Sequence, residues 1–148
     1  EVLGADSAGN VIYGNDYSGN KIILSPGTLG NLSLNYDDGK GINAYLTFQY
    51  IGKQYLDNSE DERKNPDVRN SPGYISKVIE PYTVVNAGLG FDFAKLFPSG
   101  SFRKIEFSLK ANNLLDKLYE TTGSISFGTP YWIPAATRSF YGELTIGL

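Results

Sequence analysis

The chain has 148 residues, 41% of them hydrophobic and 20% charged, and its formal net charge is -3 at pH 7. It contains no Cys and no His, which excludes disulfides, thiol nucleophiles, histidine bases and the usual soft or imidazole metal ligands. The negative charge disfavours nucleic acid as a main partner, and no stretch approaches the roughly 18 consecutive apolar residues of a membrane-spanning helix. Because Met is also absent, we expect the chain to be a processed product or an excerpt of something longer.

Residues 1–21 are expected to form a surface loop that contains a hairpin. Two imperfect copies of one pattern, residues 6–10 and 16–20, each end on Gly-Asn and are followed by β-branched residues. Gly-Asn pairs between β-branched flanks favour tight turns.

Five strands are predicted from the alternation of apolar and polar residues over residues 22–148, because successive side chains of a strand point to opposite faces. The apolar positions of the first four are Ile22, Leu24, Leu32, Leu34 and Tyr36, with a kink at Pro26 and Gly27; Ile42, Ala44, Leu46, Phe48 and Tyr50, closed by Tyr55 and Leu56; Thr83, Val85, Ala87, Leu89, Phe91 and Phe93; and Ile105, Phe107, Leu109 and Ala111. The last strand, residues 138–148, has Phe140, Gly142, Leu144, Ile146 and Leu148 on its apolar face.

The predicted connections alternate between short and long. Residues 37–41 and 94–103 form short connections, whereas residues 57–80 and 113–136 form long, polar loops. Outer-membrane β-barrels have short periplasmic turns and long extracellular loops, so this sorting favours an antiparallel transmembrane barrel.

Aromatic residues are predicted to lie near both ends of the apolar band, as is typical of a membrane interface. We expect Phe48, Tyr50, Tyr82, Trp132 and Phe140 at the outer rim, and Tyr36, Phe91 and Phe93 at the inner rim. Tyr119, Tyr131 and Trp132 are interpreted as rim anchors, with stacking on a sugar or an aromatic siderophore as the alternative.

The segment of residues 112–120, followed by Pro134 and then by residues 138–142, resembles the C-terminal signature of TonB-dependent outer-membrane receptors. The residues that carry the resemblance most directly are Asn112, Asn113, Leu114, Asp116, Tyr119 and Arg138. Residues 50–58 and 81–86 resemble the strands and loop edges that precede this signature, so the resemblance covers residues 22–148.

The resemblance implies an all-β fold in which these strands are the last five of a barrel of about 22. It implies energy-coupled import of a scarce solute, such as a siderophore or an oligosaccharide, across the outer membrane of a Gram-negative bacterium. The implied partners are outer-membrane lipid, the barrel-assembly machinery, and a plug, further strands and a contact for the TonB energising complex that are absent from this chain. The last strand, with Phe140, Gly142, Leu144, Ile146 and Leu148, would act as the assembly signal.

No catalytic residue, cofactor site or metal site is predicted. The acidic run of residues 57–62 lacks the placed glycine and terminal glutamate of an EF-hand, so it is interpreted as a solvated loop. Polar-face charges such as Asp92, Glu106 and Glu143 are expected to pair with one another or with the plug. Asn112, Asn113 and Asp116 are expected to cap the strand-to-loop transition by hydrogen bonds to nearby backbone.

One alternative from another class remains open. A soluble, secreted β-sandwich that binds a ligand, such as a carbohydrate, also alternates apolar and polar residues along its strands. In that case the apolar faces are packed into a core, and the chain folds without detergent.

Overall fold

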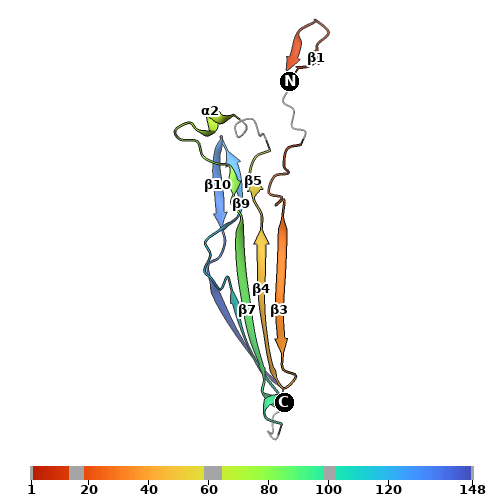
Figure 1. The fold of residues 1–148 in the computed structure, drawn as a ribbon, viewed down its shortest axis with the longest axis vertical. Coiled ribbons are helices and arrows are strands. Elements are labelled where there is room, and N and C mark those ends of the chain that lie inside the picture. Colours follow the sequence, from red (N-terminus) through yellow and green to blue (C-terminus); the bar gives the residue numbers. More distant parts are fainter. Residues whose placement is uncertain (1, 14–18, 59–64, 99–102, 148) are drawn as a thin grey trace.

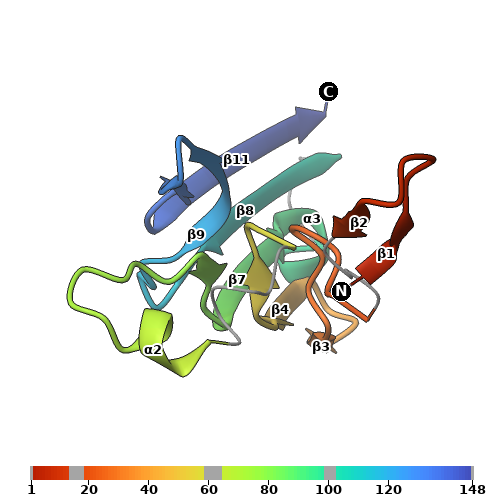
Figure 2. The same cartoon turned by 90° about the horizontal axis from the view of Figure 1, so that it is seen from above.

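A single antiparallel sheet of five strands dominates the computed structural model, which describes residues 2–13, 19–58, 65–98 and 103–147. The strands are β3 (Leu29–Asp37), β4 (Ile42–Ile51), β7 (Tyr82–Asp92), β8 (Lys104–Asn112) and β11 (Ser139–Gly147). Their order in the sheet is β11-β8-β7-β4-β3, so each strand pairs with its predecessor among the five. They run along the long axis of the molecule (Figure 1) and follow an arc when seen from above (Figure 2). The prediction of five antiparallel strands is confirmed.

One face of this sheet, the apolar face, carries exposed hydrophobic side chains. Its central row crosses all five strands through Leu34, Leu46, Ala87, Ala111 and Phe140. Side chains at both edges of the sheet are far from buried, with 55% of Leu34 and 60% of Phe140 exposed. A sandwich covers such a face with a second sheet, whereas a barrel turns it toward lipid. The described elements place no second layer over it, which contradicts the β-sandwich alternative.

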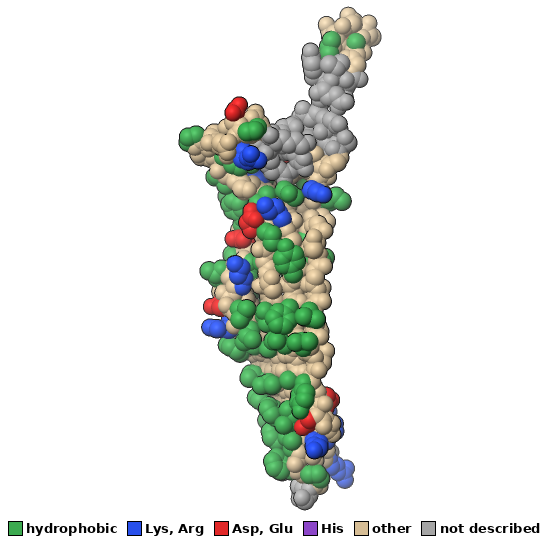
Figure 3. Space-filling view, viewed as in Figure 1, with side chains coloured by type: hydrophobic (Ala, Val, Ile, Leu, Met, Phe, Trp, Pro, Cys, Tyr) green, Lys and Arg blue, Asp and Glu red, His purple; other side chains and the backbone are tan. Residues whose placement is uncertain are grey.

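The opposite face, the polar face, carries polar side chains and glycines. One of its rows contains Asn35, Tyr45, Gly88, Lys110 and Tyr141. In the space-filling view, hydrophobic side chains gather along the lower part of the molecule, and a group of charged side chains lies beside them near its lower end (Figure 3).

The first strand of the sheet is shorter than predicted. It begins at Leu29, and the residues from Ile22 onward form a turn instead. Leu24 has a φ of 53°, and its N–H donates to the carbonyl of Tyr55 at 2.9 Å. A left-handed residue followed closely by Pro26 cannot continue a ladder. The second strand likewise ends at Ile51, and Tyr55 belongs to a separate short strand.

Both long connections contain secondary structure that the prediction assigned to loops. The first contains α2 (Pro66–Arg69) and β6 (Val78–Ile79), and β6 pairs with β5 (Gln54–Tyr55), which lies just before the predicted loop. In the second, β9 (Glu120–Ser126) and β10 (Thr129–Pro134) form a hairpin. Its two turn residues, Phe127 and Gly128, both have positive φ, at 48° and 78°, which is the backbone of a type I′ turn. Both connections lie at one end of the sheet (Figure 1).

The short connections lie at the other end of the sheet. β7 ends at Asp92, so Phe93 begins the helical turn α3 (Phe93–Leu96) rather than ending the strand. The Asp92 carboxylate caps this turn by accepting from the N–H groups of Ala94 at 3.1 Å and Lys95 at 3.2 Å. None of the described helices is long and apolar enough to cross a membrane.

The N-terminal segment contains the predicted hairpin, formed by β1 (Val2–Ala5) and β2 (Val11–Tyr13). Gly9 adopts a φ of 83° in its turn. The second predicted turn, at residues 16–20, lies largely outside the described residues.

The main cluster of buried residues lies on the polar side of the sheet, where the long connections fold back. Ile51, Leu56, Ile79, Tyr82 and Val84 form this cluster, and Tyr119 and Ile125 pack against it. Tyr82 is only 9% exposed, and its ring lies 4.2 Å from that of Tyr119. The prediction of Tyr82 as a rim aromatic is therefore wrong, because its side chain points to the polar face.

Because the apolar face is uncovered and the two outer strands have free edges, we expect the chain to associate when it is produced alone in water. Detergent micelles should keep it monomeric by covering the apolar face. Sedimentation velocity with and without detergent measures this directly. A folded monomer in plain buffer would contradict a lipid-facing sheet.

The turn between β3 and β4 offers a matched pair of glycines. Gly41 has a φ of 120°, and a Cβ on it would lie 2.6 Å from the backbone oxygen of Asp92. Gly39 has a φ of 67° and nothing within 4 Å of such a Cβ. Gly41→Ala should therefore lower the free energy of unfolding more than Gly39→Ala, whose cost of about 1–2 kcal/mol comes from the left-handed conformation alone. Urea unfolding in detergent micelles measures both, and equal losses would show that Asp92 can move aside.

Candidate functional site

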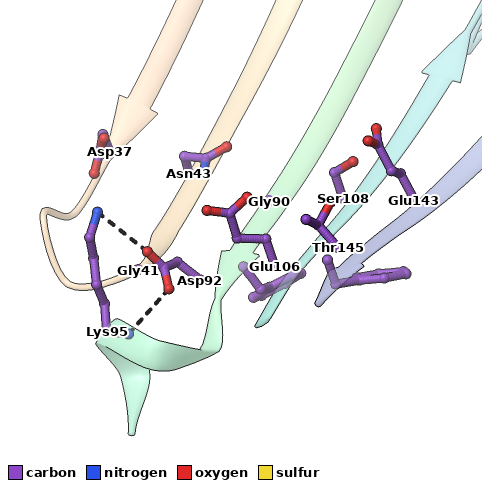
Figure 4. A pocket seen from close by; sticks show the side chains of 12 residues that line it. Asp37, Gly41, Asn43, Gly90, Asp92, Lys95, Glu106, Ser108, Glu143 and Thr145 are labelled. Carbon is purple, nitrogen blue, oxygen red and sulfur yellow. Dashed lines mark hydrogen bonds and ion pairs between the residues drawn. The ribbon is translucent and has the colours of Figure 1, made fainter. Parts of the chain in front are cut away.

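An acidic hollow of about 330 Å³ lies on the polar face, at the end of the sheet with the short connections. Four of the five strands bring a carboxylate to it, and these residues are Asp37, Asp92, Glu106 and Glu143. Lys95 of α3 also lines the hollow (Figure 4). The four carboxylates stand at polar-face positions of their strands. Because side chains alternate along a strand, all four point to the same side of the sheet.

Two of the four carboxylates have a cationic neighbour. The Lys95 ammonium lies 3.5 Å from Asp92, and the Lys104 ammonium lies 3.3 Å from Glu106. Asp37 and Glu143 form no ion pair with any described residue. Of the polar-face charges expected to pair with one another or with the plug, Asp92 and Glu106 are paired within the described residues. The hollow carries an excess of negative charge.

Two glycines of β7 make room for side chains of β4. Gly90 lies opposite Asn43, and a Cβ on Gly90 would meet the Asn43 side-chain oxygen at 2.5 Å. Gly88 lies opposite Tyr45 in the same way, with the Tyr45 Cζ at 2.7 Å. The side chains of β4 thus lie across β7, which only glycine permits at this approach.

The turn beside the hollow is held by Asp38. Its carboxylate accepts from the N–H groups of Ile42 at 2.9 Å and Lys40 at 2.8 Å. These hydrogen bonds, that of Ile42 first, hold the pKa of Asp38 below its usual value. The Asp38 carboxylate therefore stays ionised to a lower pH than an ordinary aspartate. Among the residues that the structure describes, no group of His, Cys, Asp or Glu is placed to hold a metal ion.

The residues of the predicted signature come together at the other end of the sheet, in the turn that follows β8. Asn113 is only 3% exposed and has a φ of 49°. Its side-chain amide donates to the carbonyls of Lys117 at 2.9 Å and Ala136 at 3.2 Å, and its side-chain oxygen accepts from the Lys117 N–H at 2.9 Å. Its own N–H donates to the Asn86 side chain at 2.9 Å. Asn113 thus ties β7, the turn and the segment before β11 to one another.

Asp116 and Arg138 complete this arrangement. The Asp116 carboxylate accepts from the Arg138 N–H at 2.8 Å, across the entrance to β11. The Arg138 guanidinium reaches the Leu114 carbonyl at 3.5 Å and lies 5.9 Å from the centre of the Phe140 ring. We call Asn113, Asp116 and Arg138 the turn clamp. The hydrogen bonds predicted for Asn113 and Asp116 are present, while Asn112 is exposed and stands opposite Ser139 in the sheet.

The last strand presents its predicted apolar residues on the exposed side of the sheet. Leu144 is 60% exposed and Ile146 is 61% exposed. Gly142 stands opposite Leu109 in the same face. Among the described strands, β11 pairs only with β8, so its other edge has no described partner. Leu148 lies outside the described residues. The role of this strand as an assembly signal stays a prediction.

The long connections use their aromatic and charged residues for packing. Trp132 Nε1 donates to the Val78 carbonyl at 3.0 Å, which fixes the β9–β10 hairpin to β6. Tyr119 packs on Tyr82, whereas Tyr131 is 56% exposed. At the start of the acidic run, Asp57 lies 3.5 Å from Lys77, and residues 59–62 lie outside the described residues.

The comparisons with known proteins agree with this geometry. The chain is 28% identical over 138 residues to the ferrioxamine receptor of Yersinia enterocolitica, a match that covers 93% of this chain and 16% of that protein. The chain is homologous to a part of the TonB-dependent siderophore receptors. It therefore spans about a sixth of the length of the curated relative that it matches. No family model matches the chain.

Solved structures of such receptors share the fold. The ferric citrate transporter FecA in the unliganded form superposes with a TM-score of 0.65 at 18% identity, over 92% of this chain and 19% of that one. The siderophore receptor PiuA from Acinetobacter baumannii gives a TM-score of 0.61 at 19% identity, over 95% of this chain and 16% of that one. The sheet thus matches part of a TonB-dependent receptor barrel. These receptors are Gram-negative outer-membrane transport proteins and are not enzymes.

The turn clamp can be tested with a pair of neighbouring asparagines. Asn113→Asp keeps the shape and the tolerance of a positive φ but loses two donated hydrogen bonds and buries a charge. We expect it to lower the free energy of unfolding by about 2–4 kcal/mol. Asn112→Asp, at an exposed position with the same change of charge, should cost less than about 0.5 kcal/mol. Urea unfolding in detergent compares them, and equal effects would argue against a buried, hydrogen-bonded Asn113.

Proposed function

We propose that the chain forms the last five strands of the barrel of a TonB-dependent receptor, which imports a ferric siderophore across the outer membrane. The observation that carries this proposal is the match to the ferrioxamine receptor over 93% of the chain. The exposed apolar face supports it independently, because a barrel strand alternates lipid-facing and lumen-facing residues.

The orientation follows from the two ends of the sheet. Short connections at one end and long ones at the other fit periplasmic turns and extracellular loops. Residues 57–80 and 113–136 then contribute to an outer vestibule, where the solute is bound first. Residues 1–21 belong to an extracellular loop in the same arrangement.

The polar face turns toward the barrel interior. In this arrangement the acidic hollow lies near the periplasmic exit, and its carboxylates face the plug that the missing part of the receptor supplies. Import requires no covalent chemistry from these residues. They line a polar path that opens when the TonB energising complex acts on the plug.

The free edges of β3 and β11 require further strands. Unpaired backbone groups at an edge in lipid cost several kcal/mol each, so β11 is proposed to close against the first strand of the barrel. Phe140, Gly142, Leu144, Ile146 and Leu148 would then be the lipid-facing residues that the barrel-assembly machinery reads.

The substrate class comes from the relatives. Their names specify ferrioxamine and ferric citrate, both complexes of iron. We expect deletion of the gene that encodes the chain to abolish energy-dependent uptake of at least one ferric siderophore, and the intact gene to restore it. Uptake of ⁵⁵Fe-loaded ferrioxamine, ferric citrate and a ferric catecholate measures this, with an uncoupler of the inner-membrane proton gradient as the control. Unchanged uptake of all three would count against iron import.

The orientation is testable with single cysteines, because the chain has none of its own. Ser126→Cys, in the exposed end of β9, should react with a membrane-impermeant maleimide on intact cells. Lys40→Cys, in the turn after β3, should react only after the outer membrane is permeabilised. The reverse pattern would mean that the sheet is inverted.

A further inference from the structure

A second hollow, of about 260 Å³, lies at the end of the sheet with the long connections. Among the residues that line it are Lys21, Thr28, Tyr50, Lys53 and Tyr55. Its position is fixed by two backbone hydrogen bonds. The Gly52 N–H donates to the Thr28 carbonyl at 2.8 Å, and the Leu24 N–H donates to the Tyr55 carbonyl at 2.9 Å. The turn before β3 is thereby held against the end of β4.

This hollow opens on the apolar side of the sheet. Tyr50 stands at an apolar-face position of β4, two residues after Phe48, and 40% of it is exposed. Tyr82 and Val84, which point to the polar side, are buried in the cluster described above. The acidic hollow and this hollow therefore lie on opposite faces and at opposite ends of the sheet.

The chemistry of the lining is basic and amphipathic. Among the described residues, two lysines line the hollow and no Asp or Glu does. The Lys53 ammonium lies 3.5 Å from Glu80, but the two side chains are 44% and 67% exposed, so water screens this pair strongly. Hydroxyl groups of Ser25 and Thr28 supply further hydrogen-bond donors.

Exposed apolar side chains continue from the hollow along β3 and β4. Leu32, which stands opposite Phe48, is 56% exposed, and Leu34 is 55% exposed. A ligand with acyl chains along these residues would bring its headgroup level with Tyr50 and the two lysines. Long basic side chains at the rim of an apolar band place their charge at the headgroup level.

We propose that this hollow binds the phosphate headgroup of a membrane lipid, with the ammonium groups of Lys21 and Lys53 on the phosphate and the acyl chains along Phe48 and Leu32. This inference rests on the proposed function, because it requires the apolar face to meet lipid. It adds a specific lipid site to the outer rim of the barrel. A free anion of the same charge would lack the apolar contact, and a transported solute would bind on the polar face.

The test uses the complete receptor in neutral detergent and bisphosphorylated lipid A as the probe. Native mass spectrometry counts bound lipid in the wild type, in the Lys21→Gln/Lys53→Gln variant, and in Lys40→Gln/Lys95→Gln as the control with the same charge change at the opposite end. We expect at least tenfold weaker binding in the first variant and no change in the control. A lipid of equal chain length with a neutral sugar headgroup should bind all three proteins equally weakly.

Three outcomes would overturn the proposal. They are equal loss of lipid A in both double variants, no loss in either, and full displacement of the lipid by excess inorganic phosphate, which would mark an anion site without lipid specificity. Iron uptake by the wild type is measured separately. Failure of uptake would refute the proposed transport function, whereas the lipid-binding measurement tests the lipid site independently.

Discussion

Every backbone N–H and C=O in the interior of a membrane must find a partner within the protein, and the five-stranded sheet is arranged to meet that constraint. Its ladders are regular from β3 to β11, with unbroken pairing of Leu29–Ile51 through Asp37–Asn43 and of Ser139–Asn112 through Gly147–Lys104. This regularity lets the side chains sort cleanly. Because the period is two, one face becomes apolar throughout, and the other is left for polar groups and glycine.

The long connections depend on that sheet in turn. They are too polar to form a core alone, so they fold back onto the polar-face side of its end, where Ile79 becomes fully buried beside Tyr82 and Val84. Asn113 joins the same region by hydrogen bonds rather than by apolar contact. A buried amide with all its partners close by is specific in direction, which apolar packing is not. The β9–β10 hairpin is thus set at a fixed place above β8 and β11.

The charged residues are also divided between the two faces of the sheet. In the proposed orientation, ionisable groups on the apolar side, such as Lys53, lie at the rim, where water or headgroups can solvate them. The polar face collects carboxylates at one end, where Asp92 also caps α3 and so connects the electrostatics of the hollow to the local fold. The glycines of β7 let Tyr45 and Asn43 lie flat across the sheet, which keeps this face open for a neighbour.

The sequence by itself determined the strands of the sheet, their faces and the sorting of connections, because a two-residue period and clusters of Gly, Pro and Asp are local signals. The hydrogen bonds of Asn113 and Asp116 in the turn clamp could be predicted from the sequence, because both residues closely follow a strand. Only the tertiary structure decided the rest. Leu24 has a strand-like neighbourhood but adopts a left-handed turn held by Tyr55, and the β9–β10 turn has Phe127 where Asn or Asp would have signalled it. Likewise, the alternation of β7 puts Tyr82 on the polar face, but only its contact with Tyr119 shows that it is buried there. The Leu24–Tyr55 and Tyr82–Tyr119 contacts join residues distant in sequence, so no local pattern could have revealed them. The β9–β10 turn is local, but it lacks the Asn or Asp that usually signals such a turn.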